Sequence, residues 1–244
     1  MPGTWSSRGC TSWCTPRADE PRVKRFIEPL LAGTSLTTGG AYDDDLQYVR
    51  DLGLIAATDP VRVANPIYRE VIARTLAFPV ASQVTENPSR FVLPDGRLDF
   101  PLLLEAFADF WVDHGAEMAR DEKYHEVSTQ VVFMGFLQRI VNGGGYVDRE
   151  YALGTGRTDI LVRKPYGDGQ VQREYIELKV WLPKKGDPLE AGLRQLDGYL
   201  ATARLDAGTL VIFDRREGAL PAAERTGITH LTSPAGNAVT LLRA

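Results

Sequence analysis

The 244-residue chain has few cysteines and no long apolar run. Its two cysteines, Cys10 and Cys14, are too few for a four-ligand structural zinc site or a disulfide framework. The longest apolar runs, such as residues 131–134, are far shorter than the ~20 residues that span a bilayer. The first residues lack the apolar core of a secretory signal. We therefore expect a cytoplasmic protein without a membrane-spanning segment.

The chain also lacks an excess of positive charge and a phosphate-binding loop. It carries 32 acidic and 28 basic residues, a formal net charge of −4. A protein that binds nucleic acid through bulk charge is usually basic, so this total argues against such a binder, although it is compatible with a local basic groove. No G-x-x-x-x-G-K-S/T run occurs, so the chain has no P-loop of its own.

What is present is an ordinary globular composition, which divides into several segments. Residues 1–21 have no period that could bury a face, and we expect them to be disordered. Residues 22–76 show the order helix, helix, β-wing, helix, which is that of a winged-helix unit. Because seven basic residues there are balanced by seven acidic ones, composition alone favours a small packing module over a DNA-binding one. Residues 77–100 form a polar connector with Pro and Gly turn signals.

Residues 101–244 are predicted to form the main domain. Helical periodicity favours helices at about 101–118 and 121–141, after which the period changes to two. Strands are predicted at about 146–153, 157–164, 171–181, 209–213, 228–231 and 239–242, with one helix over 188–204. This order of elements predicts an α/β fold in which helices flank the sheet.

The candidate chemistry lies on two neighbouring predicted strands. On the later strand, Glu177 and Lys179 alternate with apolar residues and therefore point to the opposite face from them. If a three-residue loop at 167–169 joins the strands, Asp159 lies opposite Glu177, with Cβ atoms about 4.5–5.5 Å apart. A two-residue turn would place the two acids on opposite faces.

Two carboxylates this close repel each other unless a cation lies between them. Asp159 and Glu177 are therefore candidate ligands of Mg²⁺, with Mn²⁺ as an alternative. A metal bound there lowers the pKa of a water and offsets charge that develops on a phosphodiester. Lys179 would hold the attacking water or help to deprotonate it. The same three residues also fit a surface ion-pair ladder.

Glu126 is a further candidate. It shares a helical face with Gln130, Phe133 and Leu137. Because the apolar end of this face must pack on the sheet, we expect Glu126 to lie near the edge of the sheet, as a supporting acid that accepts a hydrogen bond from a metal-bound water or orients Lys179. A solvated carboxylate in a first helical turn is the alternative.

Several polar residues downstream are candidates for contacting substrate. Gln195 and Tyr199 are four apart on the last long helix and lie together beside its buried leucine stripe, although Tyr199 also fits a core margin. Residues 157–194 hold eight basic and six acidic residues, a local charge of +2. Within this segment, Arg157 and the loop residues Lys184 and Lys185 suit phosphate contacts, and a solvated loop is the simpler explanation for the lysines.

At these residues the chain resembles the PD-(D/E)XK nuclease superfamily, whose restriction-endonuclease-like core is an α-β-β-β-α-β mixed sheet flanked by helices. The motif positions of that superfamily are matched in order by Glu126, Asp159, Glu177 and Lys179. Gln195 matches a Gln that is frequent on the helix after the third strand. The resemblance covers about residues 105–244 and implies Mg²⁺-dependent hydrolysis of nucleic acid, with DNA endonuclease activity as the expectation.

The flanking sequence is similar to the C-terminal domain of bacterial AAA-like ATPases with a nuclease-like tail. This similarity is carried by FLQRIVNGGG (136–145), GTGRTD (154–159) and IELKVW (176–181). LGLI (52–55) and ANPIYRE (64–70) resemble the winged-helix segment that follows the ATPase domain in those proteins. The ATPase module itself is absent, so we expect a truncated or split form of a longer ancestor.

Three functions remain open from the sequence. The first is a Mg²⁺-dependent phosphodiesterase that acts on DNA. The second is a non-catalytic module, regulatory or degenerate, that binds nucleic acid or docks an ATPase in trans. The third is a remnant without a biochemical role. Many enzymes of this fold act as dimers, and a dimer is compatible with this chain.

Overall fold

The computed structural model describes residues 20–31, 43–58, 61–64, 77, 80–115, 128–141, 144–153 and 156–244. Most of the predicted leader, residues 1–19, therefore lies outside the described residues. Within the described ranges, no helix combines the length and the apolar character needed to cross a membrane.

Two short helices and a hairpin form the described part of the N-terminal unit. Helix α2 (Pro21–Leu31) packs on α3 (Asp44–Asp51), which Asp43 caps by accepting hydrogen bonds from two backbone N–H groups of its first turn. An antiparallel bridge joins Ile55 to Val63 within the segment predicted as the β-wing, and residues 59–60 between them lie outside the described residues. The helix expected to end at Thr75 lies outside the described residues, so the winged-helix assignment remains a prediction.

The connector packs against the main domain rather than only linking it. Its short 3-10 helix η1 (Pro88–Phe91) buries Phe91 completely. The Gln172 side chain on the sheet accepts a hydrogen bond from the Leu98 backbone N–H at 2.7 Å and donates one to the Leu98 carbonyl at 3.0 Å. The sequence predicted only turns here, because proline and glycine indicate local backbone conformation. The burial of Phe91 depends on contacts with distant segments, which these signals do not report.

The main domain is an α/β domain with a six-stranded mixed sheet, as predicted. Its strands are β1 (Tyr146–Leu153), β2 (Gly156–Tyr166), β3 (Gln170–Trp181), β4 (Ala207–Asp214), β5 (Gly227–Thr232) and β6 (Ala238–Arg243). Their order in the sheet is β1-β2-β3-β4-β6-β5. Pairs β1–β2, β2–β3 and β5–β6 are antiparallel, whereas β3–β4 and β4–β6 are parallel.

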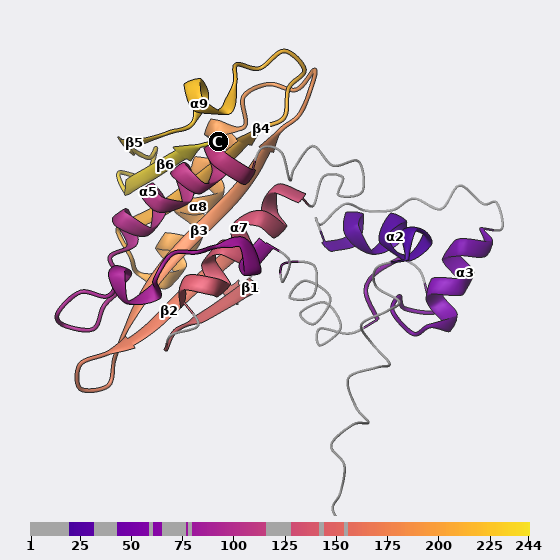
Figure 1. Ribbon diagram of the computed structural model, residues 1–244, viewed down its shortest axis with the longest axis horizontal. Helices are drawn as coiled ribbons and strands as arrows, with labels where there is room; N and C mark the ends of the chain where they lie inside the picture. Colours follow the sequence, from indigo (N-terminus) through magenta and orange to yellow (C-terminus); the bar gives the residue numbers. More distant parts are fainter. Residues whose placement is uncertain are drawn as a thin grey trace, which may run out of the picture.

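Helices cover both faces of this sheet (Figure 1). On one face lie α5 (Phe100–Phe110) and α7 (Ser128–Val141), and the other carries α8 (Leu189–Ala203). Helix α5 continues into a π-helical turn, η2 (Trp111–Gly115), where the sequence predicted an unbroken helix to residue 118. The first part of the other predicted helix, residues 121–127, lies outside the described residues. A four-residue helix, α9 (Ala222–Arg225), precedes β5.

The two faces of β3 belong to two different cores. Ile176 and Leu178 pack with α5 and α7 in a core that contains Phe107 and Phe133, whose ring centroids lie 4.7 Å apart. Tyr175 packs on the opposite face with the leucines of α8. The strand alternation predicted from the sequence is therefore confirmed, and it directs Glu177 and Lys179 toward α8.

Candidate functional site

The hairpin between β2 and β3 has the register on which the predicted site depends. Tyr166 pairs with Gln170, and Ile160 pairs with Ile176. The three-residue loop between the strands starts and ends with glycines at φ +48° and φ +81°, a region that glycine adopts without strain. Continued by one residue, this register places Asp159 opposite Glu177, as predicted.

The two carboxylates lie in different hydrogen-bonding environments. Asp159 Oδ2 accepts the backbone N–H of Leu178 at 2.8 Å, which draws its side chain onto β3. Glu177 is 0% exposed, and its Oε1 lies 2.6 Å from Lys179 Nζ. The other carboxylate oxygen of Glu177, Oε2, is buried without a hydrogen-bond partner among the described residues. A buried oxygen without a partner is costly, so Glu177 Oε2 is an acceptor that a bound cation could use.

The pKa of Glu177 also indicates a buried carboxyl group close to a second negative charge. The pKa of this carboxyl group is raised to about 8, because burial and then the charge of Asp159 raise it by more than the Lys179 ammonium lowers it. Asp159 therefore lies close enough to oppose the ionisation of Glu177. A divalent cation between them would remove this repulsion and use the free oxygen of Glu177.

The donor set fits Mg²⁺ or Mn²⁺ better than a metal that needs a full protein cage. No group of three or more His, Cys, Asp or Glu side chains that could hold a metal occurs in the part of the chain that is described. Mg²⁺ commonly binds through one or two carboxylates and keeps several waters or substrate phosphate oxygens. Asp159 and Glu177 supply such a pair.

A chain of hydrogen bonds connects Lys179 to α8. Lys179 Nζ donates to Gln195 Oε1 at 2.8 Å, and Gln195 Nε2 donates to the Tyr199 hydroxyl at 2.7 Å. The structure thus brings together five of the predicted site residues: Asp159, Glu177, Lys179, Gln195 and Tyr199. Tyr199 is buried, so it contacts Gln195 from within the protein and is not an exposed residue that substrate would touch first.

Gly192 allows α8 to approach β3 and β4 closely, and sequence reasoning missed it. A Cβ at this position would lie 2.7 Å from Leu210 Cδ1 and 3.3 Å from Lys179 Cγ. Any larger residue would therefore have to displace the Leu210 side chain or the helix itself. The signal available in the sequence is a glycine beside the leucine stripe of a helix, where it otherwise costs helix stability.

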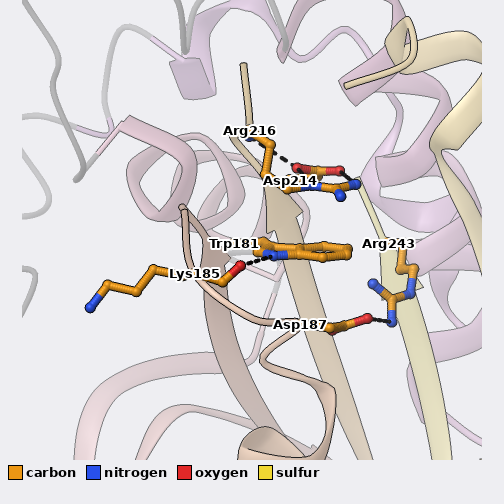
Figure 2. A network of polar contacts seen from close by, with 6 residues as sticks. All are labelled: Trp181, Lys185, Asp187, Asp214, Arg216 and Arg243. Atoms are coloured by element: carbon orange, nitrogen blue, oxygen red, sulfur yellow. Dashed lines mark hydrogen bonds and ion pairs between the residues drawn. The ribbon is translucent and has the colours of Figure 1, made fainter. Parts of the chain in front are cut away.

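The loop with Lys184 and Lys185 leaves the end of β3 and is anchored there. Trp181 Nε1 donates to the Lys185 carbonyl at 3.0 Å, while both lysine side chains are exposed. Figure 2 shows the Trp181 ring between two ion pairs, Asp214–Arg216 and Asp187–Arg243. The Arg216 guanidinium carbon lies 3.5 Å from the ring centroid.

Two predicted residues are not placed. Glu126 lies outside the described residues, as does the side chain of Arg157, whose backbone belongs to β2. The described part of the Glu126 face behaves as expected, since Phe133 and Leu137 are fully buried. Helix α7 packs on the face of β3 opposite to Glu177.

No protein-family model matches this chain, and comparisons with curated proteins and with solved structures find no match either.

Proposed function

We propose that this chain hydrolyses phosphodiester bonds of nucleic acid, with DNA as the expected substrate, in a reaction that depends on a divalent cation. The observation that carries the proposal is the pair of carboxylates on β2 and β3. Asp159 and Glu177 face each other, and Glu177 keeps one buried oxygen without a hydrogen-bond partner in the described structure, directly beside the Lys179 ammonium.

Asp159 and Glu177 are the residues that would hold Mg²⁺, because they supply the hard oxygen ligands that this ion prefers. When bound, the ion supplies a water of lowered pKa and offsets negative charge on the phosphate. Binding requires Glu177 to be ionised, which removes its proton from the site. The Leu178 N–H keeps Asp159 oriented, since it holds one oxygen of that carboxylate.

Lys179 is held ready for a water or a phosphate oxygen. An ammonium group has three donors. Two of them are used, at 2.6 Å from Glu177 and at 2.8 Å from Gln195. The third is not taken up by a hydrogen bond to the described residues, so it is the donor that would position the attacking water. Gln195 fixes the direction of this donor, and Tyr199 in turn holds the Gln195 amide.

The order of elements supports a restriction-endonuclease-like fold as part of this proposal. Helix α7 is followed by β1, β2 and β3, then α8 and β4. The candidate metal ligands stand on the second and third of these strands, and the glutamine stands on the next helix. The descent from an AAA-like ATPase, with a winged-helix unit and an ATPase partner in trans, rests on the sequence resemblance.

A second function is a non-catalytic module that binds nucleic acid or docks an ATPase. One observation favours it: the Lys179 ammonium donates to Glu177 and Gln195, which is the arrangement expected of a structural ion pair. The lysine loop at 184–185 would then serve binding alone.

Cleavage of supercoiled plasmid by the full chain separates the two functions. We expect nicking with Mg²⁺ or Mn²⁺, none with EDTA, and losses of at least 100-fold in Asp159→Asn and Lys179→Met. Glu190→Gln is a matched control, because Glu190 is an exposed carboxylate on α8 with 85% of its side chain accessible. Equal nicking by wild type and Asp159→Asn would contradict the hydrolase. Binding of DNA without cleavage in either metal would favour the second function.

A further inference from the structure

A second group of polar and basic side chains lies at the carboxyl ends of β3 and β4. It surrounds a cavity of about 280 Å³. The lining residues that matter here are Trp111, Thr129, Asp214, Arg215, Arg216 and Arg225. They come from η2, the first described turn of α7, the end of β4, and the connection between β4 and β5, so this cavity is assembled from segments that do not carry Asp159 or Glu177.

The charge of the cavity is positive. Among the described residues that line it, three arginines stand against two acidic residues, Asp214 and Glu217. Asp214 is already engaged, because it accepts two hydrogen bonds from the Arg216 guanidinium, at 2.9 and 2.7 Å. Burial raises the pKa of Asp214, but the hydrogen bonds and charge of Arg216 and the charge of Arg225 lower it below its ordinary value. Asp214 therefore stays ionised and orients Arg216 at neutral pH.

Two uncharged side chains that line the cavity are also hydrogen-bond donors that need an acceptor. Trp111 is 2% exposed and Thr129 is 0% exposed, and Trp111 Nε1 and Thr129 Oγ1 have no hydrogen-bond partner within the described structure. An indole N–H is a donor only, and a threonine hydroxyl can donate. A buried donor without an acceptor costs free energy, so these atoms and the excess positive charge favour the same kind of ligand.

We propose that this cavity binds a phosphate group. A phosphate presents several acceptor oxygens and negative charge, and guanidinium groups recognise it through paired N–H donors. The volume lies just below the 300–1,000 Å³ of most small-ligand sites, which suits a phosphate with little attached to it inside the cavity. The phosphate belongs either to a nucleic-acid strand or to a free phosphorylated small molecule.

The position of the cavity is compatible with both sources. Arg216 stacks on Trp181, which lies two residues beyond Lys179 on β3 (Figure 2). At 3.3 Å per residue, the two β3 positions are about 7 Å apart along the strand. A strand of nucleic acid at Lys179 could therefore place another phosphate near Arg216. The proposal does not depend on hydrolysis, because a small phosphorylated ligand needs none.

Calorimetric titration of the metal-free full chain with inorganic phosphate tests the site. We expect saturable binding that becomes at least tenfold weaker in Arg225→Gln. Thr129→Val, which removes one hydroxyl and preserves shape, should weaken binding about threefold while the unliganded protein stays as stable as wild type or becomes more stable. The control is Arg90→Gln, which removes an exposed arginine on η1. Equal phosphate affinity in wild type, Arg225→Gln and Thr129→Val would overturn the proposal.

A second titration, in EDTA, identifies the source of the phosphate. It uses a single-stranded octanucleotide with and without a 5′-phosphate. A tenfold loss of octanucleotide affinity in Arg225→Gln supports the site and assigns it to nucleic acid, whereas an unchanged octanucleotide affinity with weakened inorganic phosphate binding supports it as a small-molecule site. Asp159→Asn should bind inorganic phosphate like wild type, so failure of the hydrolase and failure of this site give different results.

Discussion

Glu177 and Lys179 stand two residues apart on β3 with Glu177 Oε1 and Lys179 Nζ separated by 2.6 Å, while Glu177 Oε2 is buried without a hydrogen-bond partner in the described residues. One oxygen of the carboxylate is thus committed to the lysine, and the other remains available. Asp159 faces Glu177 from β2. The Glu177 carboxylate therefore lies between the candidate metal position and Lys179, the candidate water-positioning residue.

The raised pKa of Glu177 predicts how the metal-free protein responds to pH. Its carboxyl group keeps a proton up to about pH 8 when folded, but loses it near the ordinary value of 4.5 when unfolded. The folded state therefore binds more protons across this window, and the free energy of unfolding falls as the pH rises through it. Between pH 5 and pH 8, we expect wild type to lose roughly 3 kcal/mol relative to Glu177→Gln.

Urea unfolding in EDTA at both pH values measures this difference. Glu190→Gln serves as control and should follow the wild type, since its carboxylate is exposed. A Glu177→Gln protein with the same pH dependence as wild type would mean that Glu177 ionises normally.

The close approach of α8 to β3 predicts opposite effects for two glycines of the same helix. Gly192→Ala would place a Cβ 2.7 Å from Leu210 Cδ1, so we expect a loss of about 1–3 kcal/mol of stability and a displaced Lys179. Gly198→Ala meets nothing within 4 Å and should gain about 0.5–1 kcal/mol, because alanine favours helix. Thermal unfolding and cleavage assays of both variants test this, and equal behaviour would contradict the packing.

The hydrogen-bond chain from Lys179 to Tyr199 predicts graded effects on turnover. Gln195→Ala removes one acceptor of the ammonium and should lower kcat about tenfold with little change in KM, because it acts on orientation rather than on substrate binding. Tyr199→Phe keeps the ring and removes the hydroxyl that accepts from Gln195, so we expect a loss of about threefold. A larger loss of kcat in Tyr199→Phe than in Gln195→Ala would contradict the proposal that Tyr199 acts on Lys179 through Gln195.

The register of the candidate site could be predicted because its causes are local. A period of two on β3 separates Glu177 and Lys179 from their apolar neighbours. The glycines at both ends of the 167–169 loop favour a three-residue connection, and this alone determines that Asp159 and Glu177 share a side. The same local signals located every strand of the main domain to within a few residues.

The features that could not be predicted depend on contacts between distant segments. The burial of Glu177 requires α8 to pack over β3, which Gly192 permits. Gln172 binds the Leu98 backbone and Arg216 stacks on Trp181, in each case across many residues of chain. Propensity and periodicity carry no information about such pairs, so the packed connector and the arginine cavity emerged only from the structure.

The exposed Lys184 and Lys185 side chains are expected to contribute to DNA binding through charge alone. Replacing Lys184 and Lys185 together by alanine should weaken binding uniformly across sequences and lower the slope of log affinity against log salt by about 2. Trp181→Phe keeps a ring under Arg216 but frees the Lys185 carbonyl, and we expect a smaller, twofold to threefold effect. Fluorescence anisotropy at several salt concentrations measures both, with Arg90→Ala as control. An unchanged salt slope in the double variant would exclude the loop from the interface.

The most direct measurement is calorimetric titration of the full chain with Mn²⁺ at pH 7. We expect one saturable site, accompanied by proton release because Glu177 must ionise, and loss of that site in both Asp159→Asn and Glu177→Gln. Wild-type protein that binds no Mn²⁺, or binds it equally well after either substitution, would contradict the metal site and with it the proposed hydrolysis.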